Sequence, residues 1–198
     1  MAVLMILDWE GVTTEDYDRV NEAMGVHTDD NAPDGLIMHT AAVTDDGRLI
    51  IADVWESEEK LGHFVQTQLM PALQKVGVPP AEPRVMPVHN KLRGRSPDAG
   101  VLTLVEVPGG TVAEYQRLVD AMPHDHTDGN HPSHLHVAAM DGDMLVVCDL
   151  WPSLEAFGQF IESEVIPATQ RTGVDLGSMR QSTGTIHNRI RGRAATTA

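Results

Sequence analysis

The stretch AVLMILDWEGVTTEDYDRV at residues 2–20 returns as GVLTLVEVPGGTVAEYQRL at residues 100–118. The matching positions keep nearly the same separation to the end of the chain. Self-similarity at a fixed period is typical of a structural unit that has been repeated. The sequence therefore predicts two copies of one fold with these boundaries: unit 1 at 1–94, a linker at 95–99, unit 2 at 100–192, and a frayed tail at 193–198.

Each copy reads as strand, helix, strand, strand, helix, strand. Short apolar runs predict buried strands, and Asp-Gly pairs predict a hairpin between the second and third strands. A threonine or serine at the expected start of each helix predicts an N-cap. The expected strands are 3–7, 36–43, 48–55 and 84–92 in the first copy, and 101–105, 133–140, 143–151 and 183–191 in the second; the expected caps are Thr13, Ser57, Thr111 and Ser153.

The order βαββαβ is that of the ferredoxin-like motif, an antiparallel sheet with both helices on one face. The other face of this sheet is too apolar to remain in contact with water, and packing against a second copy would cover it. We therefore expect an α+β fold in which two tandem ferredoxin-like βαββαβ units form an intramolecular pseudo-twofold α/β-barrel. Such a chain would be a monomer with a pseudo-dimer barrel, or a homodimer.

The corner between the third strand and the long helix resembles a known superfamily. It reads VWES at 54–57 with LMPAL at 69–73, and LWPS at 150–153 with VIPA at 165–168. This pattern is similar to the dimeric α/β-barrel (ferredoxin-like) superfamily and most similar to its antibiotic-biosynthesis-monooxygenase-like branch, here as a tandem fused dimer. The superfamily includes cofactor-independent oxygenases, cyclases, isomerases and haem-degrading enzymes, together with proteins of no known activity.

The composition excludes several classes of partner. The formal net charge is −15 and only 4% of the residues are aromatic, which argues against nucleic acid and anionic membrane surfaces. The sole cysteine, Cys148, lies in the apolar run MLVVCDLW and reads as a buried thiol. The N-terminal stretch lacks the basic region of a signal peptide, and no apolar run approaches the ~20 residues of a membrane-spanning helix. We therefore expect a cytoplasmic protein without a membrane partner.

Two equivalent histidines are the predicted catalytic residues. His39 and His136 lie in the second strands, among the apolar neighbours IMHTAAV and HLHVAAM. A buried imidazole needs a hydrogen-bond partner, and near neutral pH it can act as a base or as a hydrogen-bond donor. We expect both to face a cavity between the two sheets or to hold its wall. The alternative is a core histidine held by a backbone carbonyl or by Asp53 or Asp149.

Asp53 and Asp149 occupy equivalent positions in the third strands, within IIADVW and VVCDLW. A carboxylate in an apolar strand is costly unless it is paired. A histidine partner would orient an imidazole for base chemistry, whereas an arginine partner would be structural. We slightly favour an arginine as the partner of each aspartate, since arginines recur in both copies at Arg19, Arg93, Arg117 and Arg191.

Other duplicated residues are the remaining predictions for ligand binding. The loop after the first helix has the tripeptide His-Thr-Asp in both copies. Either this loop caps the mouth of the barrel, or its side chains only form local hydrogen bonds within a turn. The two tryptophans that end the third strands read as core more than as a platform for a ligand. The expected ligand-binding residues are His27, His126, Asp53, Asp149, Trp55, Trp151, His89 and His187.

Additional histidines crowd the second copy in the stretch PHDHTDGNHPSHLH. His134 and His136 are two residues apart in an expected strand and should share a face, so with His126 or His131 they could hold a divalent transition metal, His126 being the chosen third ligand. Haem is disfavoured, because His63 on the second helix is matched by Gln159 and the first strand lacks the asparagine that a haem degrader would carry. We expect no cofactor, with the divalent metal as the alternative.

The resemblance and the histidines together predict a small monooxygenase- or cyclase-like enzyme. It would bind an apolar, aromatic or polyketide-like metabolite in the barrel cavity, without a cofactor, and use histidine as base or hydrogen-bond donor. The alternative is a non-catalytic protein that binds a small ligand or a metal through the second copy. No glycine-rich phosphate loop and no nucleophile elbow occurs, so nucleotide and hydrolase chemistry lose support.

Overall fold

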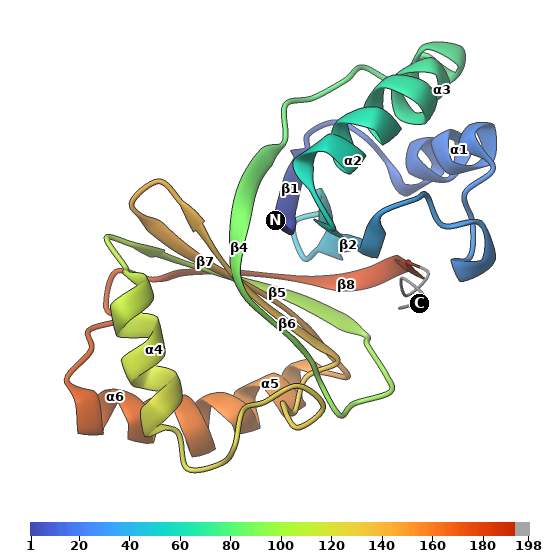
Figure 1. Cartoon of the computed structure of the whole chain (residues 1–198). Helices are drawn as coiled ribbons and strands as arrows, with labels where there is room; N and C mark the ends of the chain where they lie inside the picture. Colours follow the sequence, from blue (N-terminus) through green and yellow to red (C-terminus); the bar gives the residue numbers. More distant parts are fainter. Residues whose placement is uncertain (193–198) are drawn as a thin grey trace, which may run out of the picture. The chain divides into compact units, whose positions relative to one another are not determined.

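The computed structural model describes residues 1–192, and the predicted tail at 193–198 lies outside the described residues. Both repeats have the expected order of elements (Figure 1). The first contains β1 (Val3–Trp9), α1 (Thr14–Met24), η1 (Asp29–Asn31), β2 (Leu36–Thr44), β3 (Leu49–Trp55), α2 (Glu58–Phe64), η2 (Val65–Leu69), α3 (Met70–Val76) and β4 (Arg84–Arg93). The second contains β5 (Val101–Pro108), α4 (Val112–Ala121), β6 (Leu135–Asp141), β7 (Met144–Trp151), α5 (Leu154–Phe160), η3 (Ile161–Val165), α6 (Ile166–Thr172) and β8 (Arg180–Arg191).

The strands of each repeat are arranged in the ferredoxin-like order. The first repeat has β4-β1-β3-β2 and the second has β8-β5-β7-β6, with antiparallel pairing of β1 to β3 and of β5 to β7. Further pairing of β2 with β8 and of β6 with β4 closes the strand order into a barrel. The predicted α+β fold, with two ferredoxin-like repeats and a closed barrel, is confirmed.

The two compact units of the structure do not coincide with the two sequence repeats. Unit 1 contains Met1–Pro87 and the chain from Ile186 on, and unit 2 contains Val88–Thr185. β4 therefore begins in unit 1, where it pairs with β1, and ends in unit 2, where it pairs with β6. β8 begins in unit 2, where it pairs with β5, and ends in unit 1, where it pairs with β2. Each repeat thus supplies the last part of its final strand to the unit that the other repeat builds.

All four predicted helix caps are confirmed. The hydroxyls of Thr13 and Thr111 accept hydrogen bonds from the backbone of Asp16 and Glu114, whose carboxylates bond back to the cap residue. Ser57 and Ser153 likewise accept from the backbone N–H three residues on, at the starts of α2 and α5. These bonds satisfy N–H groups that a helix start otherwise leaves unpaired.

The long helix of each repeat contains a π-helical turn in its middle, η2 in the first and η3 in the second. Pro71 and Pro167 lie at the start of the helical segments that follow, α3 and α6. Proline has no N–H to donate, and its ring displaces the carbonyl four residues earlier, so a wider turn before it relieves the clash. In both repeats the proline is thus accompanied by a π turn.

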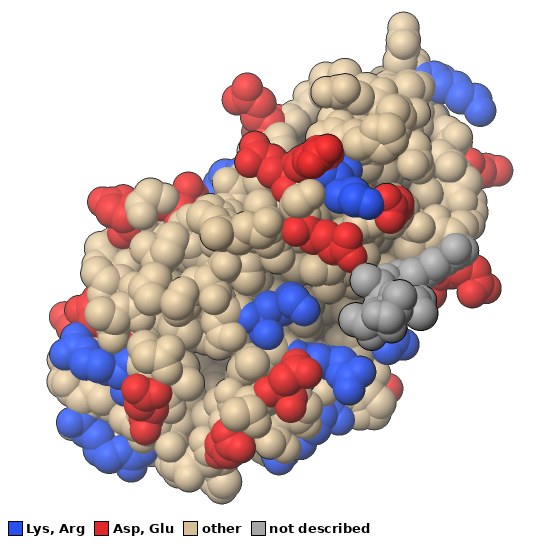
Figure 2. All heavy atoms as spheres, viewed as in Figure 1, with Lys and Arg blue, Asp and Glu red and all other residues tan. Residues whose placement is uncertain are grey.

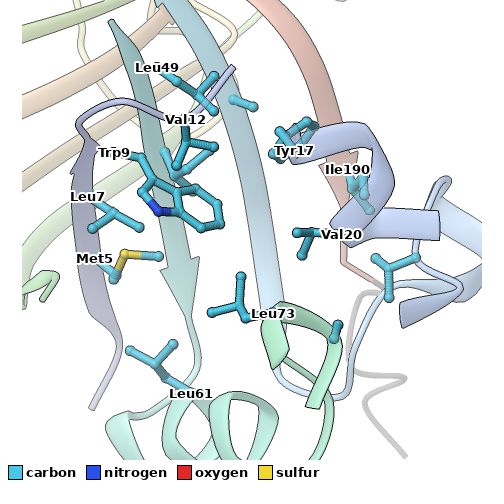
Figure 3. Close-up of a cluster of buried hydrophobic side chains, with 14 of the residues drawn as sticks. Met5, Leu7, Trp9, Val12, Tyr17, Val20, Leu49, Leu61, Leu73 and Ile190 are labelled. Carbon is cyan, nitrogen blue, oxygen red and sulfur yellow. The ribbon is translucent and has the colours of Figure 1, made fainter. Parts of the chain in front are cut away.

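In each unit the helices pack on one face of the strands and enclose an apolar core. In unit 1, Trp9 from β1, Tyr17 and Val20 from α1, Leu73 from α3 and Ile190 from β8 point toward one another (Figure 3). In unit 2, buried clusters form around Tyr115 with Leu145, and around Trp151 with Phe157 and Phe160. Both expected tryptophans of the core, Trp55 and Trp151, are fully buried.

Two matching glycines are required by the close approach of neighbouring backbone. A Cβ atom on Gly94 would lie 1.7 Å from the carbonyl oxygen of Ser133, and one on Gly192 would lie 1.6 Å from that of Leu36. Their N–H groups donate to the carbonyls of His134 and Ile37 at 3.0 Å. The repeated glycine that ends HNKLRG and HNRIRG is thus explained by the space available to it.

On the face shown in Figure 2, lysine and arginine side chains lie among aspartates and glutamates rather than in a continuous basic track. Within residues 1–192, no helix combines the length and the apolar character needed to cross a membrane.

Candidate functional site: two duplicated Asp-His-Tyr networks

In unit 1, His39 and Asp53 face each other across the ladder between β2 and β3. The Nδ1 atom of His39 lies 2.7 Å from Oδ1 of Asp53, and the indole N–H of Trp55 donates to the other carboxylate oxygen at 3.3 Å. Because an ionised carboxylate can only accept, Nδ1 of the imidazole carries the proton. In the neutral ring, Nε2 is then left as a hydrogen-bond acceptor.

Tyr17 of α1 completes this network. Its hydroxyl oxygen lies 2.6 Å from Nε2 of His39, to which it donates when the ring is neutral. The side-chain amide of Asn188 on β8 donates to the same oxygen at 2.9 Å. Burial raises the pKa of Tyr17 to about 12, so the hydroxyl stays protonated near neutral pH.

Unit 2 repeats the arrangement with matching residues. Nδ1 of His136 lies 2.7 Å from Oδ1 of Asp149, and its Nε2 lies 2.8 Å from the hydroxyl of Tyr115. Asn90 on β4 donates to that hydroxyl at 2.7 Å. Burial raises the pKa of Tyr115 to about 12. One difference is that the buried indole N–H of Trp151 has no partner within the described residues.

Each network lies in the wall of a cavity within its own unit. The cavity of unit 1 has a volume of about 140 Å³ and that of unit 2 about 110 Å³. An apolar cavity of about 150 Å³ can hold a benzene ring. Both cavities are lined by strands and by helices of one unit, so the expectation that His39 and His136 line a cavity between two sheets is wrong in its location.

The cavity of unit 2 contains a further histidine, His131, where the first repeat has Ala32. Its ring stacks on that of His136 with centroids 4.7 Å apart, and its Nδ1 lies 2.7 Å from the hydroxyl of Ser133. Burial, together with the neighbouring His136 and His126, lowers the pKa of His131 to about 2. This imidazole is therefore neutral at any ordinary pH.

His126 lines the same cavity and is held by Glu164, a buried carboxylate on η3. Its Nε2 lies 3.3 Å from Oε2 of Glu164, and the exposed His124 binds the other carboxylate oxygen. Burial alone would raise the pKa of Glu164, but the hydrogen bonds from His124 and His126 outweigh it and lower the pKa. Glu164 is thus an ionised group that fixes the orientation of the His126 ring.

The preference for arginine partners of the strand aspartates is wrong, because Asp53 and Asp149 bond to histidines. The arginines are engaged elsewhere: Arg19 pairs with Asp16 and Arg117 with Glu114, one helical turn away. The i, i+3 spacing on a helix brings these charges together without a long-range contact.

The expected metal ligands His126, His134 and His136 are not brought together. His134 precedes the first residue of β6, and its Nδ1 lies 2.9 Å from the carbonyl oxygen of Ser96. Strand alternation therefore does not apply to it. In the part of the chain that the structure describes, no three His, Cys, Asp or Glu side chains are placed to hold a metal ion.

Of the other predicted ligand-binding residues, Trp55 lines the cavity of unit 1, whereas His27, His89 and His187 line neither cavity. His27 is exposed, and His187 bonds to Asp18 at 2.8 Å and makes an edge contact with Tyr17. His89 is also exposed and makes an edge contact with Tyr115. The repeated His-Thr-Asp loop is held by local bonds, and its aspartates accept the backbone N–H of the final strands: Asp29 from Arg191 and Asp128 from Arg93, both at 2.7 Å.

Several residues of the networks were not predicted as site residues. Tyr17 and Tyr115 are the only two tyrosines of the chain and occupy equivalent positions, which is a signal that the sequence does contain. Asn90 and Asn188 each follow a duplicated histidine and could have been found in the same way. Glu164 could not, because the matching residue of the first repeat is Gln68.

Comparisons with known proteins bear on the fold alone. No family model matches the chain, and no curated protein matches it. A solved structure of a candidate monooxygenase from Lactobacillus acidophilus is similar over 96% of both chains, with a TM-score of 0.69 and 10% identity. An anthrone oxidase-like protein matches over 95% of this chain and 92% of its own, with a TM-score of 0.53 and 15% identity.

A third similar structure is a ferredoxin-fold protein from Listeria monocytogenes, described as related to antibiotic biosynthesis monooxygenases. It covers 94% of both chains, with a TM-score of 0.50 and 10% identity. The chain therefore has a ferredoxin-like α/β-barrel fold that is similar to these structures over nearly its whole length.

Proposed function

We propose that each unit binds a small aromatic metabolite in its cavity and oxygenates it without a cofactor, in a monooxygenase-like reaction. The observation that carries this proposal is the duplicated Asp-His-Tyr network in the wall of an apolar cavity. Apolar walls with a few convergent polar groups are typical of small-molecule sites. The cytoplasmic location and the monomeric or dimeric state expected from the sequence stay predictions.

The network is arranged to accept a proton from a substrate. The oxygen of Tyr115 has a lone pair beyond the one that the Asn90 amide occupies. Tyr17, in contrast, has the side chain of Asn21 as a second asparagine partner, which a substrate would have to displace. A substrate proton passes to the tyrosine oxygen while the tyrosine proton passes to Nε2 of the histidine, and the aspartate stabilises the imidazolium that results. The substrate is left as an anion, and the asparagine N–H stabilises the negative charge that develops on the tyrosine oxygen during transfer.

Dioxygen would be the second substrate. The substrate anion gives its electrons to dioxygen and forms a C–O bond, which leaves a peroxide on the carbon. Loss of the second hydrogen of that carbon as a proton then breaks the O–O bond and forms a C=O group. One dioxygen and one CH₂ group yield one carbonyl and one water, so no external reductant is needed.

Some proteins of similar fold carry names that refer to oxygenation, which supports this proposal. They include candidate monooxygenases and an anthrone oxidase-like protein. An aromatic substrate with an acidic C–H or O–H bond suits both the apolar walls and the proton-accepting network. The size of the cavities favours one aromatic ring within each unit.

A non-catalytic ligand-binding protein is the second candidate. The hydroxyl, imidazole and carboxylate of each network satisfy one another, which is also what a purely structural buried network requires. The two candidates differ in whether the bound molecule changes.

Oxygen uptake with a panel of one-ring and two-ring phenols and enolisable ketones would distinguish them. We expect uptake by the wild-type protein and incorporation of one oxygen atom into product, detected by mass spectrometry. The double variant His39→Ala/His136→Ala should lose about 100-fold or more of this activity, while His63→Ala, an exposed residue of α2, should keep it. Tight binding of a phenol with no uptake would favour the non-catalytic candidate.

A further inference from the structure

His126 has a buried ring nitrogen without a partner. Its Nε2 faces Glu164 at 3.3 Å, and since that carboxylate only accepts, Nε2 carries the proton. Nδ1 of the neutral ring is therefore an acceptor. Within residues 1–192, nothing donates to it, although it is shielded from solvent. A buried acceptor of this kind is costly when it stays unpaired, so a donor within the cavity would be stabilised there.

His131 offers a donor beside it. The backbone N–H of Ser133 donates to Nδ1 of His131 at 3.3 Å, so that nitrogen is an acceptor and the proton of the neutral ring is on Nε2. The hydrogen bonds of this ring to the described residues all go to Nδ1, which leaves the Nε2–H for a ligand. The rings of His126 and His131 lie 5.3 Å apart by their centroids, and both line the cavity of unit 2.

The cavity of unit 1 has no such pair. Ala32 stands at the position of the second imidazole, and Gln68 at the position of the buried glutamate. His27, which matches the first imidazole, is exposed. None of these three residues lines the cavity of unit 1, whose wall around the network is apolar apart from Asn21.

We propose that His126 and His131 form a hydroxyl-recognition subsite, so that the cavity of unit 2 prefers a hydroxylated aromatic ligand over its apolar analogue more strongly than the cavity of unit 1 does. The ligand hydroxyl donates to Nδ1 of His126 and accepts from Nε2–H of His131. The inference rests on the proposed function in one respect, that the cavities are the ligand sites. It does not depend on turnover.

The three tryptophans of the chain allow the two cavities to be followed separately. Trp9 and Trp55 line the cavity of unit 1, and Trp151 lies against His131 with ring centroids 5.8 Å apart. Phenol and toluene have nearly the same size and differ in the hydroxyl. The protein is labelled with ¹⁵N at its tryptophan indoles and titrated with each probe, and a dissociation constant is obtained from the shift of each indole resonance. The ratio of the toluene to the phenol dissociation constant should be about tenfold larger at Trp151 than at Trp55.

Two variants copy the first repeat into the second. His131→Ala should bring the toluene-to-phenol ratio at Trp151 to the value at Trp55. Glu164→Gln, whose amide can donate to Nε2 of His126 and so place the ring proton on Nδ1, should move the ratio in the same direction, and His27→Ala should leave both ratios unchanged. Equal ratios in the two units of the wild-type protein, unchanged ratios in the folded variants, or no shift of Trp151 with either probe would overturn the proposal. A phenol preference at Trp151 without oxygen uptake would instead contradict only the oxygenase reaction.

Discussion

The side-chain amide of Asn188 lies 2.9 Å from the hydroxyl of Tyr17, although 171 positions separate the two residues in the chain. The equivalent bond in unit 2 joins Asn90 to Tyr115. Each network is therefore completed by the final strand of the other repeat. Because β4 and β8 each run from one unit into the other, neither site can be completed by the residues of one repeat alone.

Asn188→Ala should perturb Tyr17 and leave Tyr115 unchanged, although Asn188 belongs by sequence to the same repeat as Tyr115. Asn90→Ala should do the reverse. Each variant loses one partly buried hydrogen bond, so the free energy of unfolding should fall by about 0.5–1.5 kcal/mol. Ring resonances of the two tyrosines by NMR, with denaturant unfolding, would measure both effects. Perturbation of the tyrosine in the same repeat would contradict the strand exchange.

Gly94→Ala should destabilise the protein by about 1–3 kcal/mol or more, because the new methyl group would overlap the backbone carbonyl of Ser133. Gly62→Ala is the matched control. Gly62 lies within α2, where a Cβ atom meets nothing, so alanine should raise stability by about 0.5–1 kcal/mol. Urea unfolding of both variants tests the pair. A neutral Gly94→Ala would mean that the strand end can shift to accept a side chain.

Much of this fold could be predicted from the sequence, because its signals are local and occur twice. Thr13 and Thr111 predict their capping boxes from a spacing of three residues. The sequence does not identify His39 as the partner of Asp53: a carboxylate in an apolar strand requires a partner, and the recurring arginines favour the wrong one. The exchange of strand ends has no local signal at all. It depends on which strands β4 and β8 pair with in the folded chain, so the repeat to which Asn90 or Asn188 belongs does not indicate the unit in which it lies.

Both tyrosines should remain un-ionised at the pH where free tyrosine loses its proton. Their pKa values are raised by burial to about 12, from an ordinary value near 10. Between these values the unfolded chain holds fewer tyrosine protons than the folded one, so stability should fall as the pH rises from about 10 to about 12. Tyrosinate absorbance and urea unfolding across this range provide the measurement. An ionisation step near pH 10 in the folded protein would show that a tyrosine is accessible to water.

His131 should make the protein less stable as the pH falls below about 6.5. The unfolded chain binds a proton at this residue near pH 6.5, whereas the folded chain, with a pKa of about 2, does not. Stability should therefore decrease by up to about 1.4 kcal/mol per pH unit between pH 6.5 and 5, and be unaffected by this group above pH 6.5. His131→Ala should reduce the slope. Equal slopes for the two proteins in urea unfolding would refute the assignment.

Replacing the aspartates by asparagine should abolish proton transfer while keeping the shape of the site. An asparagine amide can donate to Nδ1 of the histidine, which places the ring proton on Nε2, where the tyrosine hydroxyl can no longer deliver its own. Since the chain has two networks, each single variant, Asp53→Asn or Asp149→Asn, should lose turnover at its own site and keep the turnover of the other site. The double variant should fall about 10²–10⁴-fold in oxygen uptake. Its phenol affinity at Trp151 should change little, because Asp149 does not touch the pair of His126 and His131. A double variant that retained full turnover would remove both histidines from the reaction.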